Sequence, residues 1–238
     1  MLYHRPARER GQTDLGWLRS YHSFSFGSYY DPKHTGFSCL RVINDDTVAG
    51  GAGFDTHGHR DAEIISYITK GAVEHADTMG NRYVVPAGDV QRMSAGSGVM
   101  HSEYNASQRD PLKFLQIWIQ PNVLGISPEY EQKSVDQQKT LATLVSPDGR
   151  DGSLRIHQNA LMYKISLEPD QKLTFPLNNR SGYLHILEGA FQVSTARGEN
   201  LTLLTADGLG VRDVPEIQML SRQDSAQALW FDLPKPTV

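Results

Sequence analysis

Turn-forming residues divide this chain into short segments, and their spacing restricts the fold more than any other feature. Turn signals such as DPKHTG, PAGD, SAGSG, SPDG and NNRSG recur along the whole sequence. Between them lie runs rich in β-branched and aromatic residues, including EIISYIT, KFLQIWIQ and YLHILEG. Short strands with frequent turns are typical of sandwiches and barrels. The sequence therefore predicts an all-β protein.

Helical signals are scarce, and the best of them lie near the middle of the chain. In SPEYEQK, Ser127 offers an N-cap and Pro128 a first helical position. We expect residues 126–143 to form a partly helical connector. It would join an N-terminal barrel, residues 1–125, to a C-terminal barrel, residues 144–238. A chain of 238 residues can bury the cores of two small domains.

A weak internal repeat supports this division. EIISYITKGAVEH breaks at Gly71, and GYLHILEGAFQV breaks at Gly189 in the same setting. A second turn follows each segment, at PAGD in the first half and at ADG in the second. The pattern predicts two copies of one β-barrel, and chance similarity is the alternative.

Charge and composition exclude several classes of partner. The formal net charge is −4 without a long basic run, so nucleic acid is a poor partner. The sequence has no apolar run of about 18 residues, which argues against a membrane span. The basic start lacks a following hydrophobic run, and the single Cys39 cannot form an internal disulfide. We expect a cytoplasmic monomer, with a protein partner as an open alternative.

Two pairs of ligand-type side chains carry the chemistry. Side chains alternate between the two faces of a strand, so His57 and His59 in FDTHGHRDAE share a face. His101 and Glu103 in VMHSEYN repeat that spacing. On neighbouring strands, these pairs would bring three imidazoles and a carboxylate around one point. The sequence therefore predicts a metal site.

Glu63 is a competing carboxylate ligand to Glu103. It has the same parity as His57 and His59, provided that the strand continues unbroken. The alternative is an ion pair with an arginine such as Arg60 or Arg92, and we favour this structural role.

The ligand types indicate chemistry more than structural support. Imidazole with carboxylate suits Fe, Mn, Ni, Cu or Zn better than Ca or Mg. An octahedral metal held by four protein groups keeps two positions for water, substrate or dioxygen. Structural zinc sites are usually closed, tetrahedral and often rich in cysteine, and Cys39 lies away from both pairs.

The same residues carry a family resemblance. The first half resembles the two cupin motifs at Gly51, His57, His59, Glu63 and Gly71, and again at Gly80, Pro86, Gly88, His101 and Asn105. It departs from them where DVQRMSAGSGVM intervenes before His101. YHSFSFGSYYDP, HRDAEIISYITKG and GDVQRMSAGSGVMHSEYN resemble the pirin family, a bicupin group, over residues 14–121.

The resemblance implies two double-stranded β-helix (jelly-roll) barrels and one divalent metal. Fe(II) is the expected metal, with Zn, Mn, Ni, Cu or Co as alternatives, and the implied ligands are His57, His59, His101 and Glu103. Bacterial and human members are similar to quercetin 2,3-dioxygenases, which open a flavonol ring with O2 and release CO. Glu103 would then be the catalytic carboxylate, as ligand or base. The alternatives are a metal- or redox-sensing protein-binding module and another cupin chemistry, such as an isomerase or decarboxylase.

The second half is expected to lack a metal. His57 and His59 precede Gly71 by 14 and 12 residues, and the same offsets before Gly189 fall on Phe175 and Leu177.

The remaining histidines and the aromatic residues have less specific interpretations. We expect a structural role for His22, while the side-chain direction of His75 stays open. Surface or satisfied polar positions are expected for His4, His34, His157 and His185. The core, or an apolar pocket over the metal, is expected for Phe24, Phe26, Tyr29, Phe54 and Trp118.

Overall fold

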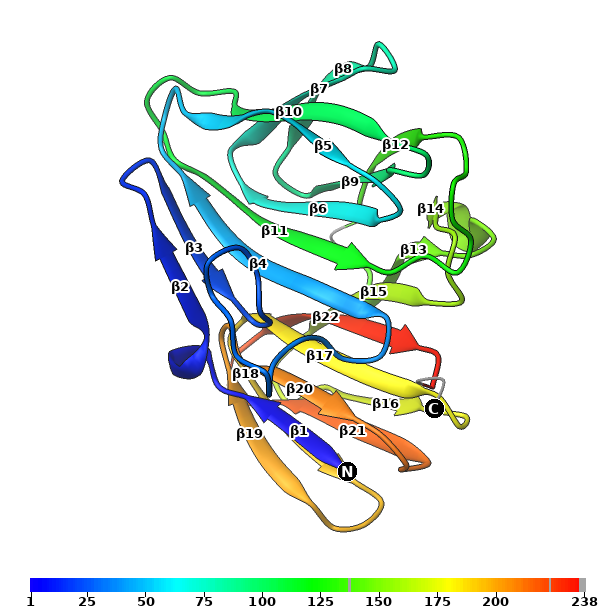
Figure 1. Ribbon diagram of the computed structural model, residues 1–238. Coiled ribbons are helices and arrows are strands. Elements are labelled where there is room, and N and C mark those ends of the chain that lie inside the picture. Colours follow the sequence, from blue (N-terminus) through cyan, green and yellow to red (C-terminus); the bar gives the residue numbers. More distant parts are fainter. Residues whose placement is uncertain (137, 223, 236–238) are drawn as a thin grey trace.

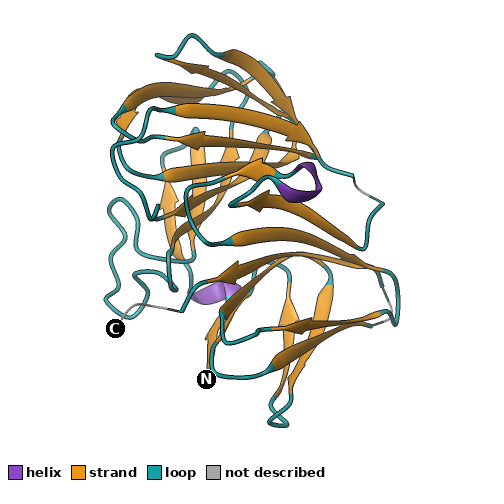
Figure 2. Ribbon diagram, turned by 90° about the vertical axis from the view of Figure 1, so that its right-hand side faces the viewer, coloured by secondary structure: helices purple, strands orange, loops and turns teal. Residues whose placement is uncertain are grey.

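The protein folds into two β-barrels, one above the other in Figure 1. This computed structural model describes residues 1–136, 138–222 and 224–235. Strands dominate the described chain, and its helical segments are two short 3-10 turns, η1 (Ala7–Glu9) and η2 (Arg150–Gly152) (Figure 2). The all-β prediction is confirmed.

The first barrel consists of a seven-stranded and a four-stranded sheet. The larger sheet has the order β12-β9-β6-β11-β4-β3-β2 and the smaller one β5-β10-β7-β8. Its strands are β2 (Gly11–Asp14), β3 (Leu18–His22), β4 (Leu40–Val48), β5 (Gly53–His59), β6 (Glu63–Lys70), β7 (Ala72–Asp77), β8 (Arg82–Pro86), β9 (Asp89–Ser94), β10 (Val99–Asn105), β11 (Leu112–Ile119) and β12 (Glu129–Ser134).

The second barrel repeats this arrangement. Its sheets have the orders β1-β20-β17-β22-β15-β13-β14 and β16-β21-β18-β19. Its strands are β1 (Leu2–Arg5), β13 (Leu141–Ser146), β14 (Leu154–Arg155), β15 (Leu161–Leu167), β16 (Lys172–Pro176), β17 (Ser181–Glu188), β18 (Ala190–Thr195), β19 (Asn200–Leu204), β20 (Gly208–Val211), β21 (Glu216–Ser221) and β22 (Ala226–Leu233).

The predicted repeat is present at the two glycines. Gly71 separates β6 from β7 with φ +77°, and Gly189 separates β17 from β18 with φ +78°. This left-handed conformation favours glycine at both corners. The central strands also follow the same order in each barrel, with β9-β6-β11-β4 corresponding to β20-β17-β22-β15.

The two large sheets pack face to face through a shared apolar core. Ile43, Ile65 and Ile117 contribute from the first barrel, and Tyr183 and Phe231 contribute from the second. Burying each such side chain stabilises the fold by about 1.5–3 kcal/mol. Since side chains alternate along a strand, the intervening residues of β4, β6 and β11 face the interior of the first barrel.

The structure contradicts the predicted helical connector. Glu129–Ser134 forms β12, which pairs with β9 along its whole length. Pairing with an open sheet edge supplies more backbone hydrogen bonds than one helical turn, so it overrides the Ser127–Pro128 helix-start signal. Position 137 of the predicted connector, and positions 223 and 236–238 of the predicted C-terminal domain, lie outside the described residues.

The N-terminal strand also departs from the predicted division. Leu2–Arg5 pairs with β20 in the second barrel, although residues 1–125 were predicted to form the first. The chain therefore starts on one barrel before it builds the other (Figure 1).

Candidate metal centre

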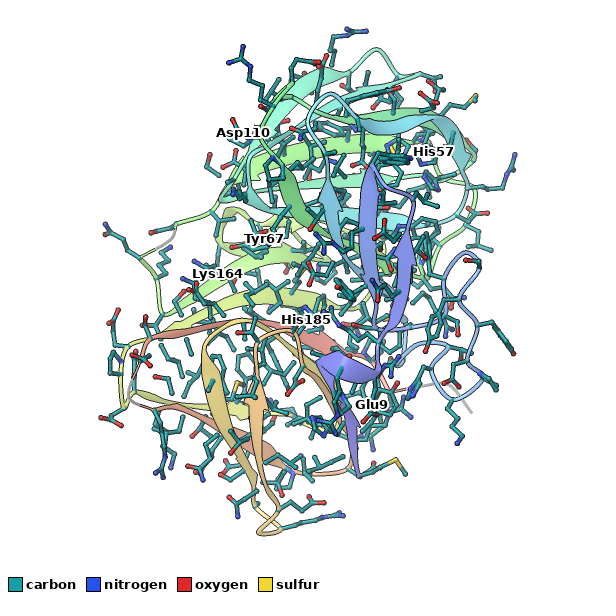
Figure 3. All side chains as sticks on the ribbon, turned by 90° about the vertical axis from the view of Figure 1, so that its left-hand side faces the viewer. Glu9, His57, Tyr67, Asp110, Lys164 and His185 are labelled. Carbon is teal, nitrogen blue, oxygen red and sulfur yellow. The ribbon has the colours of Figure 1, made fainter. Side chains whose placement is uncertain are left out.

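Three predicted histidines converge inside the first barrel. β5 and β10 are antiparallel neighbours, with His57 opposite His101. The ring centroids of His57, His59 and His101 lie 4.6 to 4.8 Å apart. One nitrogen from each ring lies within 4.8 Å of the others. Figure 3 shows His57 in this barrel, far from His185 in the second.

The imidazole nitrogens at this point are free to bind a cation. Within the described chain, His59 Nε2 and both ring nitrogens of His101 are buried without hydrogen-bond partners. His57 Nδ1 lies 2.7 Å from the Asp55 carbonyl oxygen, a contact that would leave Nε2 as the free ligand atom. Buried polar atoms rarely lack partners, so this cluster fits a divalent metal.

Burial keeps two of these rings neutral. Desolvation, reinforced by the neighbouring histidines, lowers the pKa of His59 to about 4 and that of His101 to about 3. Only the neutral imidazole has a lone pair for a metal, so these rings are ready to bind at neutral pH.

Glu103 lies deeper in the barrel and is held by hydrogen-bond donors. One carboxylate oxygen accepts from Ser66 Oγ at 3.1 Å and from Gln91 Nε2 at 2.6 Å. The other accepts from Gln116 Nε2 at 2.7 Å. Glu103 is 2% exposed. A carboxylate can only accept hydrogen bonds, so a buried one needs donors around it, and Glu103 has three.

These donors belong to a polar row that was not predicted from the sequence. Five residues lie opposite one another across successive strands of the large sheet, in the order His22, Asn44, Gln116, Ser66 and Gln91. All five are buried. The available signal was a polar residue inside each of the apolar runs EIISYIT, DVQRM and FLQIWI.

His75 is a further residue of this centre, and its direction is now clear. It lies opposite Glu103 on β7 and points into the barrel, fully buried. Its Nε2 contacts the Asp77 carboxylate at 3.0 Å, while Nδ1 has no partner among the described residues. His75, His101 and Glu103 form a second group whose ligand atoms all lie within 4.8 Å of one another. His101 is common to both groups, whereas Glu103 shares a group with His101 and His75 but not with His57 or His59.

Glu63 lies outside both groups. The strand is broken by the turn at Asp61, with φ +49°, so the parity argument from His57 does not extend to it. Glu63 accepts hydrogen bonds from Ser94 Oγ at 2.7 Å and His157 N at 3.3 Å. Glu63 makes no direct ion pair with an arginine among the described residues, but Ser94 Oγ, which donates to Glu63, accepts a hydrogen bond from Arg92 Nη1 at 3.0 Å. The favoured structural role beside Arg92 therefore fits, through Ser94.

A cavity of about 880 Å³ opens beside the histidines. Trp17, Phe26, Phe54 and Trp118 line it together with His57 and His59. The Trp118 ring packs edge-on against His59 at 5.0 Å between centroids. A cavity of this size with aromatic walls suits a flat organic ligand. Of the other predicted aromatic residues, Phe24 lies in the core between the barrels. Tyr29 accepts a hydrogen bond from Arg5 through its hydroxyl group.

The other histidines lie away from the cluster. His22 bonds Thr13 and Asn44 and lines the far side of the cavity. His4 lies beside the carboxylate of Asp207, and His157 lies beside the carboxylate of Glu129. His34 shares a hydrogen bond with the Tyr3 hydroxyl group. His185 contradicts its prediction, because it is 1% exposed and its Nδ1 has no partner within the described residues.

The equivalent positions of the second barrel carry apolar side chains. Phe175 lies opposite Ile217, as His57 lies opposite His101. Val193 lies opposite Met219, as His75 lies opposite Glu103. These four residues belong to the core of the second barrel and offer no strong metal ligand.

Comparisons with known proteins agree over the whole chain. Residues 3–119 match the family Pirin, and residues 143–233 match the quercetinase C-terminal cupin domain. The protein named quercetin 2,3-dioxygenase from Escherichia coli (strain K12) is 44% identical over 235 residues, covering 98% of this chain and 99% of that protein. These matches confirm the bicupin fold.

Solved structures give the same result. YhhW from Escherichia coli is 43% identical with a TM-score of 0.95, covering 100% of this chain and 99% of that chain. The bacterial pirin YhhW in complex with nickel(II) is 43% identical with a TM-score of 0.94, covering 100% of both chains. Separately, no helix in the described residues is long and apolar enough to cross a membrane.

Proposed function

This chain belongs to the pirin family, and from that premise we propose that it is a metal-dependent dioxygenase acting on quercetin-like flavonols. It would consume O2, open the flavonol ring and release CO. One observation carries the proposal: His57, His59 and His101 converge beside a large aromatic cavity that His57 and His59 line, and His59 and His101 have buried nitrogens without partners among the described residues. The name of the relative from Escherichia coli and the nickel(II) complex of YhhW support it.

We propose that His57, His59, His101 and Glu103 hold one divalent metal. Fe(II) is our proposed native metal, although the same ligand set suits Zn, Mn, Ni, Cu or Co. A metal bound there would supply Lewis-acid and redox chemistry toward an enol oxygen and dioxygen. Glu103 would serve chiefly as a ligand, since three donors hold its oxygens and it does not line the cavity.

The residues of the cavity would orient the substrate. A flavonol is flat and carries a 3-hydroxyl group next to a ketone. The rings of Trp17, Phe54 and Trp118 would hold the flat core and exclude water from it. The enol oxygens would then face His57 and His59, the two members of the cluster that line the cavity. Positioning of this kind accounts for a large part of the rate of many enzymes.

The test is oxygenase activity that depends on the metal. The purified protein, loaded with Fe(II) or Ni(II), is expected to consume O2 and release CO when quercetin is added, and a chelator should stop both. Replacing His57 or His101 with Ala should remove metal and activity together. Activity that survives complete metal loss would refute the proposal. A loaded protein without turnover, whose binding to another protein changes with the metal's oxidation state, would favour a redox-sensing module.

A further inference from the structure

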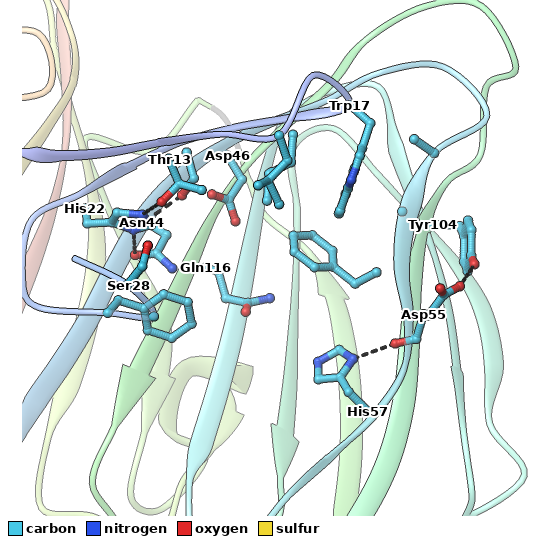
Figure 4. Close-up of a pocket in the computed structure, with 18 of the residues that line it drawn as sticks. Thr13, Trp17, His22, Ser28, Asn44, Asp46, Asp55, His57, Tyr104 and Gln116 are labelled. Atoms are coloured by element: carbon cyan, nitrogen blue, oxygen red, sulfur yellow. Dashed lines mark hydrogen bonds between the residues drawn. The ribbon is translucent and has the colours of Figure 1, made fainter.

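The cavity has a second polar region, away from the metal cluster. Figure 4 shows Thr13, His22, Asn44 and Asp46 on one side of the cavity and His57 on the other. The two sides come from different sheets, because β2, β3 and β4 belong to the large sheet and β5 to the small one. A ligand that reaches from the metal cluster across the cavity therefore meets a second set of polar groups.

Asp46 is the unsatisfied member of this region. The residue is 3% exposed, and its Oδ1 is buried with no hydrogen-bond partner in the described part of the chain. The neighbouring polar residues do have partners: His22 Nδ1 lies 2.8 Å from Asn44 Oδ1, and Thr13 Oγ1 lies 2.9 Å from His22 Nε2. Leaving a buried acceptor unpaired is costly, so a ligand donor is expected at Asp46.

The surroundings of Asp46 contain little that would neutralise a carboxylate. Burial raises its pKa to about 7, Ser20 opposes this with a hydrogen bond, and the negative charges of Asp45 and Glu103 add to the rise. Asp46 lies opposite Ser20 on β3 and Phe114 on β11. A carboxyl group in such a setting gains from a hydroxyl donor in either ionisation state.

We propose that Asp46 is a specificity-determining residue, which accepts a hydrogen bond from a phenolic hydroxyl group on the part of the substrate remote from the metal. The inference rests on the proposed function and narrows its substrate class to flavonols that carry phenolic hydroxyls in addition to the enol. The aromatic walls bind any flat core, whereas Asp46 distinguishes hydroxylated cores from bare ones.

Binding without turnover tests this directly. The metal-loaded protein is titrated under anaerobic conditions with quercetin and with 3-hydroxyflavone, which has the same core without phenolic hydroxyls. We expect quercetin to bind at least about tenfold more tightly. Asp46→Leu should remove this ratio, and Asp46→Asn should reduce it several-fold, because an amide oxygen is a weaker acceptor. Asp45→Asn is the matched control, since Asp45 is the next residue on the strand and pairs with Arg10 instead.

Every result of this titration either supports or overturns the role of Asp46. The proposal is overturned if the wild type shows no preference, or if folded, metal-loaded Asp46→Leu keeps it. It is also overturned if Asp45→Asn loses the preference as fully as the Asp46 variants do. Should Asp46→Leu fail to fold, an unchanged ratio in Asp46→Asn overturns the proposal. Aerobic turnover is measured separately. If the affinity ratio depends on Asp46 but the protein shows no turnover, only the proposed dioxygenase activity is refuted. If the protein turns over quercetin but the affinity ratio does not depend on Asp46, only the role of Asp46 is refuted.

Discussion

Replacing Glu103 with Gln tests the hydrogen-bond donors around this carboxylate, which were not predicted from the sequence. The groups that contact its carboxylate are all donors, from Ser66, Gln91 and Gln116. A glutamine would present an NH2 group to one of them, so at least one charge-assisted hydrogen bond is lost. Such a bond contributes about 1.5–3 kcal/mol. At about 2–4 °C per kcal/mol for a chain of this size, the metal-free variant should unfold roughly 3–12 °C below the wild type.

The assay compares thermal unfolding of the metal-free proteins and then measures metal affinity by titration. Loss of a carboxylate ligand should weaken metal binding at least about tenfold. Glu63→Gln is the control, because Glu63 is as deeply buried, at 1% exposure, but lies outside both ligand groups. Its metal affinity should match that of the wild type. If Glu103→Gln unfolds at the wild-type temperature and binds metal equally well, the account of Glu103 is wrong. Metal retained with turnover lost would instead assign it a chemical role beyond ligation.

Three further changes test other parts of the structure. His75→Ala should weaken metal binding about tenfold, because His75 and Asp77 support the Glu103 side of the centre. Competition with a chelator measures this affinity, and an unchanged affinity would contradict the prediction. Burial lowers the pKa of His185 to about 3, so its stabilising effect is complete above about pH 6.5 and declines as the pH falls. His185→Leu should therefore lose about 2 kcal/mol less stability than the wild type between pH 7 and pH 5 in urea unfolding; an equal loss would refute it. Trp17→Ala removes a ring that packs edge-on against Phe54, with 5.3 Å between the ring centroids. This change should raise the KM for quercetin about tenfold at unchanged metal content, because Trp17 lines the cavity. An unchanged KM would exclude Trp17 from substrate contact.

Local patterns in the sequence were sufficient to predict which histidines come close together. Strand alternation predicted the shared face of His57 and His59, and the recurrence of that spacing at His101 and Glu103 predicted that His101 lies close to both. The ligand set itself stays a prediction. The glycines at 71 and 189 predicted the two matching barrels because both need a left-handed corner. The alternation along a strand and the glycine corners each depend on a few neighbouring residues, which a single sequence displays directly.

The features that escaped prediction depend on strand register between distant segments. Gln91 and Gln116 reach Glu103 only because β9, β6 and β11 align them in one row, which no local pattern specifies. The pairing of Glu129–Ser134 with β9 has the same origin. His185 looked like a surface residue in isolation, and burial between two sheets is a property of the assembled fold.

The most direct test of the account is to locate the metal in a crystal of the loaded protein by anomalous scattering. We predict a single peak, about 2.0–2.3 Å from one nitrogen of each of His57, His59 and His101 and from one oxygen of Glu103. A peak held by His75, His101 and Glu103 without His57 and His59 would contradict the account, as would a metal bound anywhere in the second barrel.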